Sequence, residues 1–315
     1  MYYLAILFPK LLERRQLPFT RDQVMLAMIV INEFFLGVDH YLAHSISGTI
    51  VPAEWPPIIA GPVTGVFLIF AILISKRSRL ASAIIATIPL LGTILMGIYG
   101  WYLHIDRTVI EGAPVGLKVT IHTLVWAVPI IAPLTASFIG FLGISAAWRE
   151  EPADTGRLVF MGRSRLQFPF SKTRAYFFLV ALGTLACLIS SVLDHARTGF
   201  VNPWLWFPYV AGLFSVMSAV LLGVINNPSK GDLAVYAVGM FILIAIGLTG
   251  TMLHVNSVLS GTGGHIVIER FIRGAPILAP ALFADMGMLG LIALLDPTEG
   301  AKKVHTRGPA AAVSE

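Results

Sequence analysis

Residues 35–44 read Phe-Leu-Gly-Val-Asp-His-Tyr-Leu-Ala-His and end a long apolar segment. A similar ending returns at residues 192–195 as Val-Leu-Asp-His, again after an apolar run. A soluble domain has roughly 25% charged residues, whereas this chain of 315 residues is 56% hydrophobic and 12% charged. Apolar segments of about 20 residues cross a bilayer as helices. The composition therefore predicts an all-α polytopic membrane protein.

Apolar runs and the Gly, Pro and charged residues between them predict eight transmembrane helices. The expected spans are residues 22–45, 57–75, 80–104, 119–147, 174–196, 207–225, 233–255 and 271–295. We expect residues 1–21 to form an interfacial amphipathic segment and the polar tail 297–315 to be disordered. The mixed-charge stretch 149–173 is expected to be a cytoplasmic linker.

The two halves of the chain are similar in sequence. Gly97-Ile-Tyr-Gly-Trp-Tyr-Leu-His104 matches Gly247-Leu-Thr-Gly-Thr-Met-Leu-His254, and Val128-Pro-Ile-Ile-Ala-Pro133 matches Ala275-Pro-Ile-Leu-Ala-Pro280. Each half has an even number of predicted spans, so the two repeats have the same orientation in the membrane. We expect two parallel-repeat four-helix bundles, residues 22–148 and 174–296, lying side by side.

The loops between the predicted helices indicate an orientation. Most Lys and Arg residues lie on the side of both termini, including those in 10–21, 76–79, 149–174 and 302–307. Because cytoplasmic loops carry an excess of basic residues, we expect both termini to be cytoplasmic in a bacterial-type plasma (inner) membrane. The net charge of +5 then reflects topology and not nucleic-acid binding. Cys187 is the only cysteine, which excludes an intrachain disulfide and a Cys-based metal cluster.

Histidines and carboxylates gather at the predicted outer ends of the spans. The first half offers Asp39, His40, His44, His104 and His122, and the second offers Asp194, His195, His254, His265 and Glu269. Imidazoles with a carboxylate can bind copper, zinc or non-haem iron, and copper is the metal we favour. Haem b needs one His from each of two facing helices, which His40 with His104, or His195 with His254, would supply. Alternatively, the histidines occupy the interface only because it is half wet.

Glu33 and Asp285 are predicted to lie deep in the bilayer. An ionisable side chain at that depth is costly unless it is paired or faces a cavity. Glu33, His40 and His44 fall on one helix face, so Glu33 is a candidate for carrying protons toward the outer cluster. The second half has Leu188 at the position of Glu33, and Asp285 matches Phe138. Alternatively, both carboxyl groups are neutral and hydrogen-bonded to neighbouring helices.

These features favour a membrane-embedded redox subunit, part of a larger membrane complex, that exchanges electrons with quinol or a periplasmic partner. Trp55, Trp101, Trp126, Trp204 and Trp206 lie near the histidines, where aromatic walls would suit a quinone head group. One alternative is a proton-coupled or metal-ion transporter built from two repeats. Another is a cofactor-free anchor or assembly subunit that docks partners through residues 149–172.

Overall fold

The computed structural model describes residues 3–9, 19–46, 48–111, 120–160 and 164–295. The expected tail 297–315 and part of the expected segment 1–21 lie outside these residues. In chain order the helices are α1 (Tyr3–Leu7), α3 (Arg21–Ser45), α4 (Trp55–Ile74), α5 (Arg79–Ile105), α6 (Ile121–Trp126), α7 (Leu134–Ala147), α8 (Lys172–Ala196), α9 (Trp206–Val224), α10 (Lys230–Ser260), α11 (Ile268–Arg273) and α12 (Leu278–Ala293). Short 3-10 turns at Pro52–Glu54 and Pro203–Leu205 precede α4 and α9, and a π-helical turn, Asp106–Glu111, continues α5.

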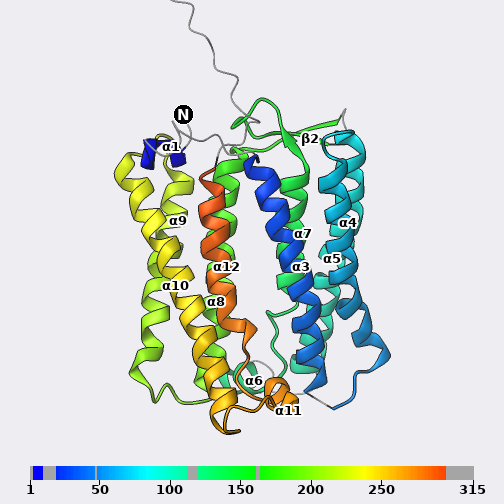
Figure 1. The fold of residues 1–315 in the computed structure, drawn as a ribbon, viewed down its shortest axis with the longest axis vertical. Helices are drawn as coiled ribbons and strands as arrows, with labels where there is room; N and C mark the ends of the chain where they lie inside the picture. The colour runs from blue at the N-terminus through cyan, green and yellow to red at the C-terminus, as the bar shows by residue number, and fades with distance from the viewer. Residues whose placement is uncertain (1–2, 10–18, 47, 112–119, 161–163, 296–315) are drawn as a thin grey trace, which may run out of the picture.

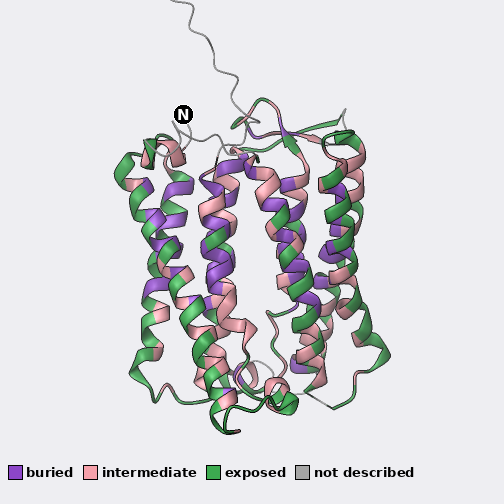
Figure 2. Ribbon diagram, in the orientation of Figure 1, coloured by how far each residue is buried: buried purple, intermediate pink, exposed green. Residues whose placement is uncertain are grey.

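Among the described residues, six helices are long and apolar enough to cross a bilayer: α3, α4, α5, α8, α9 and α10. Large apolar side chains cover their outward faces, and Leu95 and Val210, for example, are 66% and 69% exposed. Figure 2 shows this exposed outer layer around a buried interior. An apolar surface of this extent requires lipid around it. The prediction of an all-α, multi-pass membrane protein is confirmed.

The long helices stand side by side, and each half of the chain has the same pattern of neighbours (Figure 1). In the first half α3 packs on α4, α4 on α5, α5 on α7, and α7 back on α3. In the second half the same order joins α8, α9, α10 and α12. Helices α3 and α5 therefore stand diagonally across their group of helices, as do α8 and α10.

Glycines allow the closest helix contacts in both halves. A Cβ at Gly97 of α5 would collide with the backbone of Ser137 on α7, and a Cβ at Gly247 of α10 would collide with the backbone of Ala284 on α12. Next to them, Gly100 lies against Pro133 and Gly250 against Pro280. In lipid, helices associate through close packing of small residues. These glycines therefore set how near α7 and α12 approach their partners.

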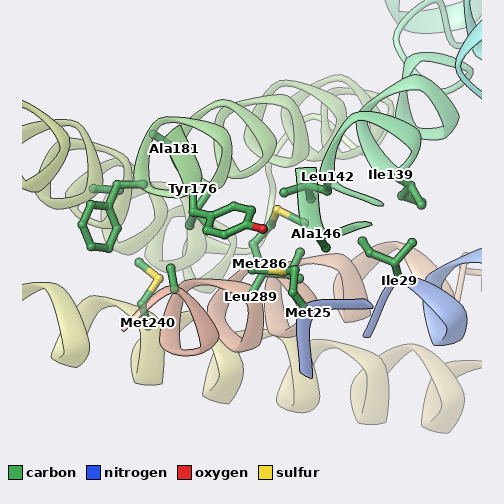
Figure 3. Close-up of a cluster of buried hydrophobic side chains, with 14 of the residues drawn as sticks. Met25, Ile29, Ile139, Leu142, Ala146, Tyr176, Ala181, Met240, Met286 and Leu289 are labelled. Atoms are coloured by element: carbon green, nitrogen blue, oxygen red, sulfur yellow. The ribbon is translucent and has the colours of Figure 1, made fainter. Parts of the chain in front are cut away.

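The two halves meet where α3 packs on α12 and α7 packs on α8. The buried side chains at this junction are apolar and come from all four helices. Figure 3 shows them, and they include Met25, Ile29, Leu142, Ala146, Tyr176, Ala181, Met286 and Leu289. Most of the apolar core shared by the two halves therefore lies on helices α3, α7, α8 and α12.

The fourth and eighth expected spans, 119–147 and 271–295, are each interrupted near a Pro-x-x-Ala-Pro segment. The first region is divided into α6 and α7, and the second into α11 and α12. Prolines at 129, 133, 276 and 280 lie at or beside these breaks, and proline lacks the N–H that a helix interior needs. Helices α7 and α12 consequently have only 14 and 16 residues.

The linker between the halves contains a small sheet that was not predicted from the sequence. Strands β1 (Arg149–Glu150), β2 (Arg157–Phe160) and β3 (Ser164–Gln167) pair antiparallel in the order β1-β2-β3. The sheet lies at one end of the helices, and α6 and α11 lie at the other (Figure 1). We call these the sheet end and the histidine end.

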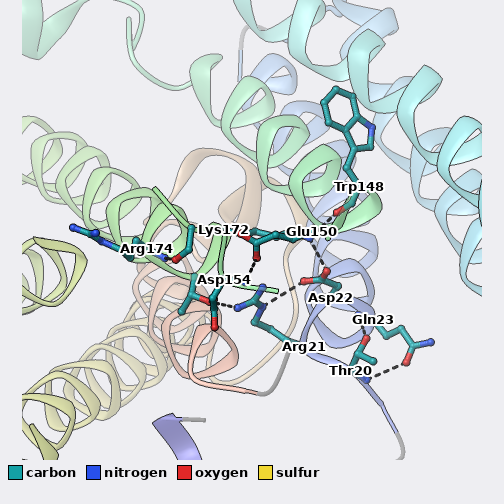
Figure 4. Close-up of polar contacts among 11 residues, drawn as sticks. Thr20, Arg21, Asp22, Gln23, Trp148, Glu150, Asp154, Lys172 and Arg174 are labelled. Carbon is teal, nitrogen blue, oxygen red and sulfur yellow. Dashed lines mark hydrogen bonds and ion pairs between the residues drawn. The ribbon is translucent and has the colours of Figure 1, made fainter. Parts of the chain in front are cut away.

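A buried ion pair at the sheet end joins the halves (Figure 4). The Lys172 ammonium group, at the start of α8, donates to Asp22 of α3 at 2.6 Å and to the Trp148 carbonyl at 2.7 Å. The Lys172 side chain is only 1% exposed. A single cation thus connects α3, α8 and the end of α7.

Two more groups complete this polar cluster. The Arg21 side chain is fully buried, donates to the Thr173 hydroxyl and lies over the Tyr176 ring, 5.1 Å from its centroid. The Glu150 carboxylate accepts hydrogen bonds from the backbone N–H groups of Asp154, Gly156 and Lys172. A buried charge is tolerated only when it is paired and hydrogen-bonded. The cluster therefore fixes both the sheet and the start of α3 against α8.

Gly97→Ala tests the glycine contact. Because the new methyl group meets the Ser137 backbone, we expect the free energy of unfolding to fall by about 1–3 kcal/mol. Gly92→Ala on the same helix is the matched control, since a Cβ there meets nothing within 4 Å. Unfolding in lipid bicelles would measure both variants. Equal losses would contradict the packing role of Gly97.

Lys172→Met tests the buried ion pair. The variant leaves Asp22 with only the longer 3.4 Å contact to Arg21, and breaking one side of a buried pair destabilises by about 3–5 kcal/mol. Arg149→Ala breaks the Arg149–Glu151 pair, whose side chains are 60% and 44% exposed, and is expected to change stability by less than about 1 kcal/mol. Denaturant unfolding of the purified protein compares the two. A loss for Lys172→Met no larger than that for Arg149→Ala would show that the pair is unimportant.

Candidate functional site

Histidines from both halves meet at the histidine end. His40 and His44 lie on the last turns of α3, His104 ends α5, His195 ends α8 and His254 lies on α10. Since α3 stands diagonally to α5, and α8 to α10, each half brings imidazoles toward each other from two non-adjacent helices.

In the first half three imidazole rings form a row. The His40 and His44 rings stack with centroids 6.4 Å apart, and the His44 ring meets the His104 ring edge-on at 6.5 Å. Nδ1 of His44 lies 3.2 Å from a Glu54 carboxylate oxygen. The ring that contacts His104 is therefore His44, one turn beyond the His40 that the sequence reading paired with it.

The second half has one such pair. The His195 and His254 rings meet edge-on with centroids 6.3 Å apart, as the sequence reading expected. Asp194 is half-buried beside His195. Gly199 takes the place that His44 has in the first half, so this half has two imidazoles instead of three.

The Nδ1 atoms of His104 and His254 make the same contact in the two halves. His104 Nδ1 lies 2.8 Å from the Pro129 carbonyl oxygen, and His254 Nδ1 lies 2.8 Å from the Pro276 carbonyl oxygen. His40 Nδ1 similarly lies 2.8 Å from the Leu36 carbonyl oxygen. A carbonyl oxygen only accepts hydrogen bonds, so Nδ1 donates in all three cases. In the neutral ring the proton is then on Nδ1, and Nε2 carries the lone pair.

The local sequence explains why these two carbonyl groups are available. In an α-helix a carbonyl accepts from the N–H four residues later. Pro133 follows Pro129 by four positions and Pro280 follows Pro276 by four, and proline has no N–H. A continuous α-helix could therefore not supply a backbone N–H donor to these two carbonyl groups. The histidines on α5 and α10 satisfy them instead.

The other predicted ligands do not join the imidazole rows. Asp39, His122, His265 and Glu269 are exposed, His122 lies beside Trp126, and Glu269 pairs with Arg273. Across the described residues, no group of three or more His, Cys, Asp or Glu side chains is arranged to hold a metal ion. The five-residue clusters expected in each half are thus not brought together. The described residues bring together the row His40–His44–His104 in the first half and the pair His195–His254 in the second.

The two deep carboxyl groups, Glu33 of α3 and Asp285 of α12, have different surroundings. Glu33 is fully buried within the first half, and neither carboxyl oxygen has a hydrogen-bond partner among the described residues. Asp285 of α12 is 7% exposed and accepts a hydrogen bond from the Asn32 side chain of α3 at 3.2 Å. The Asn32–Asp285 bond therefore crosses between the halves, whereas Glu33 faces inward.

The sequence reading missed several residues of this site. Glu54, Asn32 and Thr93 were not singled out, and the Pro129 and Pro276 carbonyl groups were not predicted as hydrogen-bond acceptors. The spacing of the prolines, four apart in both halves, was the available signal for those carbonyl groups. Glu54 carried no signal, because its contact with His44 depends on how the turn before α4 folds.

Comparison with known protein families, with curated proteins and with solved structures finds no match to this chain. The function must therefore be argued from the site itself.

Proposed function

We propose that the chain is an integral membrane redox subunit that holds a haem b or a copper ion between paired imidazoles at the histidine end. The observation that carries the proposal is the hydrogen bond from Nδ1 of His104 and of His254 to a proline carbonyl oxygen. Metal-binding histidines characteristically donate their other ring N–H to a carbonyl or carboxylate, which orients the ring. His44 has the carboxylate version of this arrangement, with Glu54.

The residues fit haem b better than a copper ion bound by protein groups alone. Haem iron needs only two axial protein ligands because the macrocycle fills its other positions. Two imidazoles that lie close together, one from each of two facing helices, would hold such a group. The pairs His44–His104 and His195–His254 have centroids 6.5 and 6.3 Å apart. The bound group would supply one-electron oxidation and reduction, and the chain would supply oriented Nε2 atoms.

We further propose the eight-helix architecture of two parallel repeats, with α6–α7 and α11–α12 as broken fourth and eighth spans. The equal helix order, the matched glycine contacts and the matched histidine–carbonyl bonds support it. Arg77, Arg149, Arg157 and Lys230 lie toward the sheet end, so the positive-inside rule puts that end in the cytoplasm of a bacterial-type inner membrane.

With this orientation the redox centres lie near the outer surface. Trp55, Trp126, Trp204 and Trp206 at that end are 44%, 59%, 78% and 55% exposed. Exposed indole rings at this depth belong to the membrane interface, where a quinol head group also lies. Quinol from the bilayer and a periplasmic electron carrier are therefore the electron-exchange partners we propose, within a larger membrane complex.

One observation favours a second function, transport between the two repeats. The Asn32–Asp285 hydrogen bond is a buried polar contact between α3 and α12, and a rocking motion of the halves would break it. A metal-free protein whose substrate uptake is lost in Asp285→Asn would establish transport and exclude the redox role.

The optical spectrum and metal content of the purified protein test the redox proposal. We expect a Soret band from up to two haems per chain, or stoichiometric copper if the ion is bound directly. His104→Gln and His254→Gln should each remove the centre of one half, because each takes away one member of the His44–His104 or the His195–His254 pair.

His122→Gln and His265→Gln are the matched controls, since both side chains are exposed at the same end and lie outside the pairs. They are expected to keep the full spectrum. A preparation with no Soret band and no stoichiometric copper or iron would contradict the proposal, as would equal losses in all four variants.

A further inference from the structure

Among the described residues of the first half, Glu33 is the buried ionisable side chain that has no hydrogen-bond partner on either carboxyl oxygen. It is fully buried on α3. Taking an ionised carboxylate out of water without a partner is strongly unfavourable. The neutral acid is therefore the resting form, and ionisation needs positive charge from elsewhere.

The helices packed around Glu33 place hydroxyl groups, but no Lys or Arg side chain, at the same depth along the helices as Glu33. The Thr64 and Thr93 hydroxyls bond each other at 3.3 Å between α4 and α5. Gly61 of α4 lies against the Glu33 carbonyl oxygen, where a Cβ would collide. Apart from these two hydroxyl groups, the buried side chains of α4 and α5 near Glu33 are apolar.

The ionisable groups that face Glu33 are few. Helices α4 and α7 contain none, and α12 contributes only Asp285, which is held by Asn32. The ionisable groups of α5 and α11 are Arg79 at the sheet end and, toward the histidine end, Tyr99, Tyr102, His104, Glu269, Arg270 and Arg273. Helix α3 itself adds Arg21 and Asp22 at the sheet end and Asp39, His40, Tyr41 and His44 toward the histidine end. Among all these groups, the charge that would change with the redox state is the one at the His44–His104 pair.

The second half lacks this site. Leu188 stands at the position of Glu33 and packs on Gly212, the counterpart of Gly61. Leu243 replaces Thr93, and Ser215, the counterpart of Thr64, donates its hydroxyl to the Ala211 and Gly239 carbonyl oxygens. The two halves thus have similar imidazole pairs, but the second half has no carboxyl group at the position of Glu33, and its own buried carboxyl group, Asp285 of α12, is held by Asn32 of α3.

We propose that Glu33 is a redox-linked proton site for the first-half centre. An electron from quinol or a reduced partner would remove one positive charge at the His44–His104 pair and so raise the proton affinity of the Glu33 carboxylate. Near the pH at which Glu33 titrates, part of the Glu33 population would then take up a proton from water, and would release it when the electron leaves. The inference rests on the proposed redox function and adds an asymmetry to it, since only the first half would couple electron and proton uptake.

The expected size follows from the helix geometry. Glu33 precedes His44 by eleven positions on α3, which is ~16 Å at 1.5 Å per residue. A unit charge at that distance changes proton affinity by about fivefold at an effective dielectric constant near 20. Converted at 59 mV for each tenfold change of a one-electron couple, the midpoint potential should fall by about 40 mV as pH rises through the titration of Glu33.

Two single-centre proteins make the test. His254→Gln keeps only the first-half centre, and His104→Gln keeps only the second-half centre, which has Leu188 in place of Glu33. Potentiometric titration at several pH values and reduced-minus-oxidised infrared spectra are recorded for each. We expect a pH-dependent potential and a gain in carboxylic acid C=O absorption in His254→Gln, and neither in His104→Gln.

Glu33→Gln and Glu33→Leu in the His254→Gln background should abolish both signals, and the Leu variant copies the packing of the second half. Asp285→Asn identifies the carboxyl group, because the C=O signal should persist in it.

A first-half centre whose potential and C=O signal are the same with and without Glu33 overturns this inference and leaves the redox function standing. A C=O signal lost in Asp285→Asn but kept in Glu33→Gln also overturns it. The absence of any centre overturns the redox function together with this inference.

Discussion

The hydrogen bond from a histidine Nδ1 to a proline carbonyl oxygen is the interaction on which the site depends. It occurs twice, at His104–Pro129 and at His254–Pro276, each at 2.8 Å. The paired prolines remove the backbone N–H that a helix would offer four residues on, and the histidine Nδ1–H is the donor that each carbonyl group accepts instead. The same bond orients the ring and leaves the Nε2 lone pair as its coordinating atom.

The packing of the helices places these bonds where they can form. Gly97 and Gly100 on α5 let the start of α7 approach closely, and His104 lies one to two turns further along α5. The irregular segment before α7 therefore passes beside the His104 ring. Gly247, Gly250 and His254 repeat this arrangement on α10. Helix contact, helix break and imidazole orientation are thus consequences of one short sequence pattern that occurs in both halves.

The sequence was sufficient for the membrane class, for six helices and for the His195–His254 contact, because these depend on apolar length and on which helix ends lie together. It was insufficient where a partner comes from an irregular segment. The contact of His44 with Glu54 depends on the turn before α4, and the buried Lys172–Asp22 pair depends on how α3 meets α8. The expected ligands Asp39, His122 and His265 are exposed and belong to three separate segments, α3, α6 and the loop before α11, so a similar position at one end of the helices was not enough to bring them together.

The protonation pattern of His104 and His254 tests this account most directly, since it can be measured without any bound cofactor. Nitrogen-15 NMR of histidine-labelled protein in lipid nanodiscs distinguishes the two neutral ring forms, and His104→Gln and His254→Gln assign the signals. In the neutral form of both rings we expect the proton on Nδ1 and a bare Nε2. Neutral rings that carry their proton on Nε2 would contradict this account.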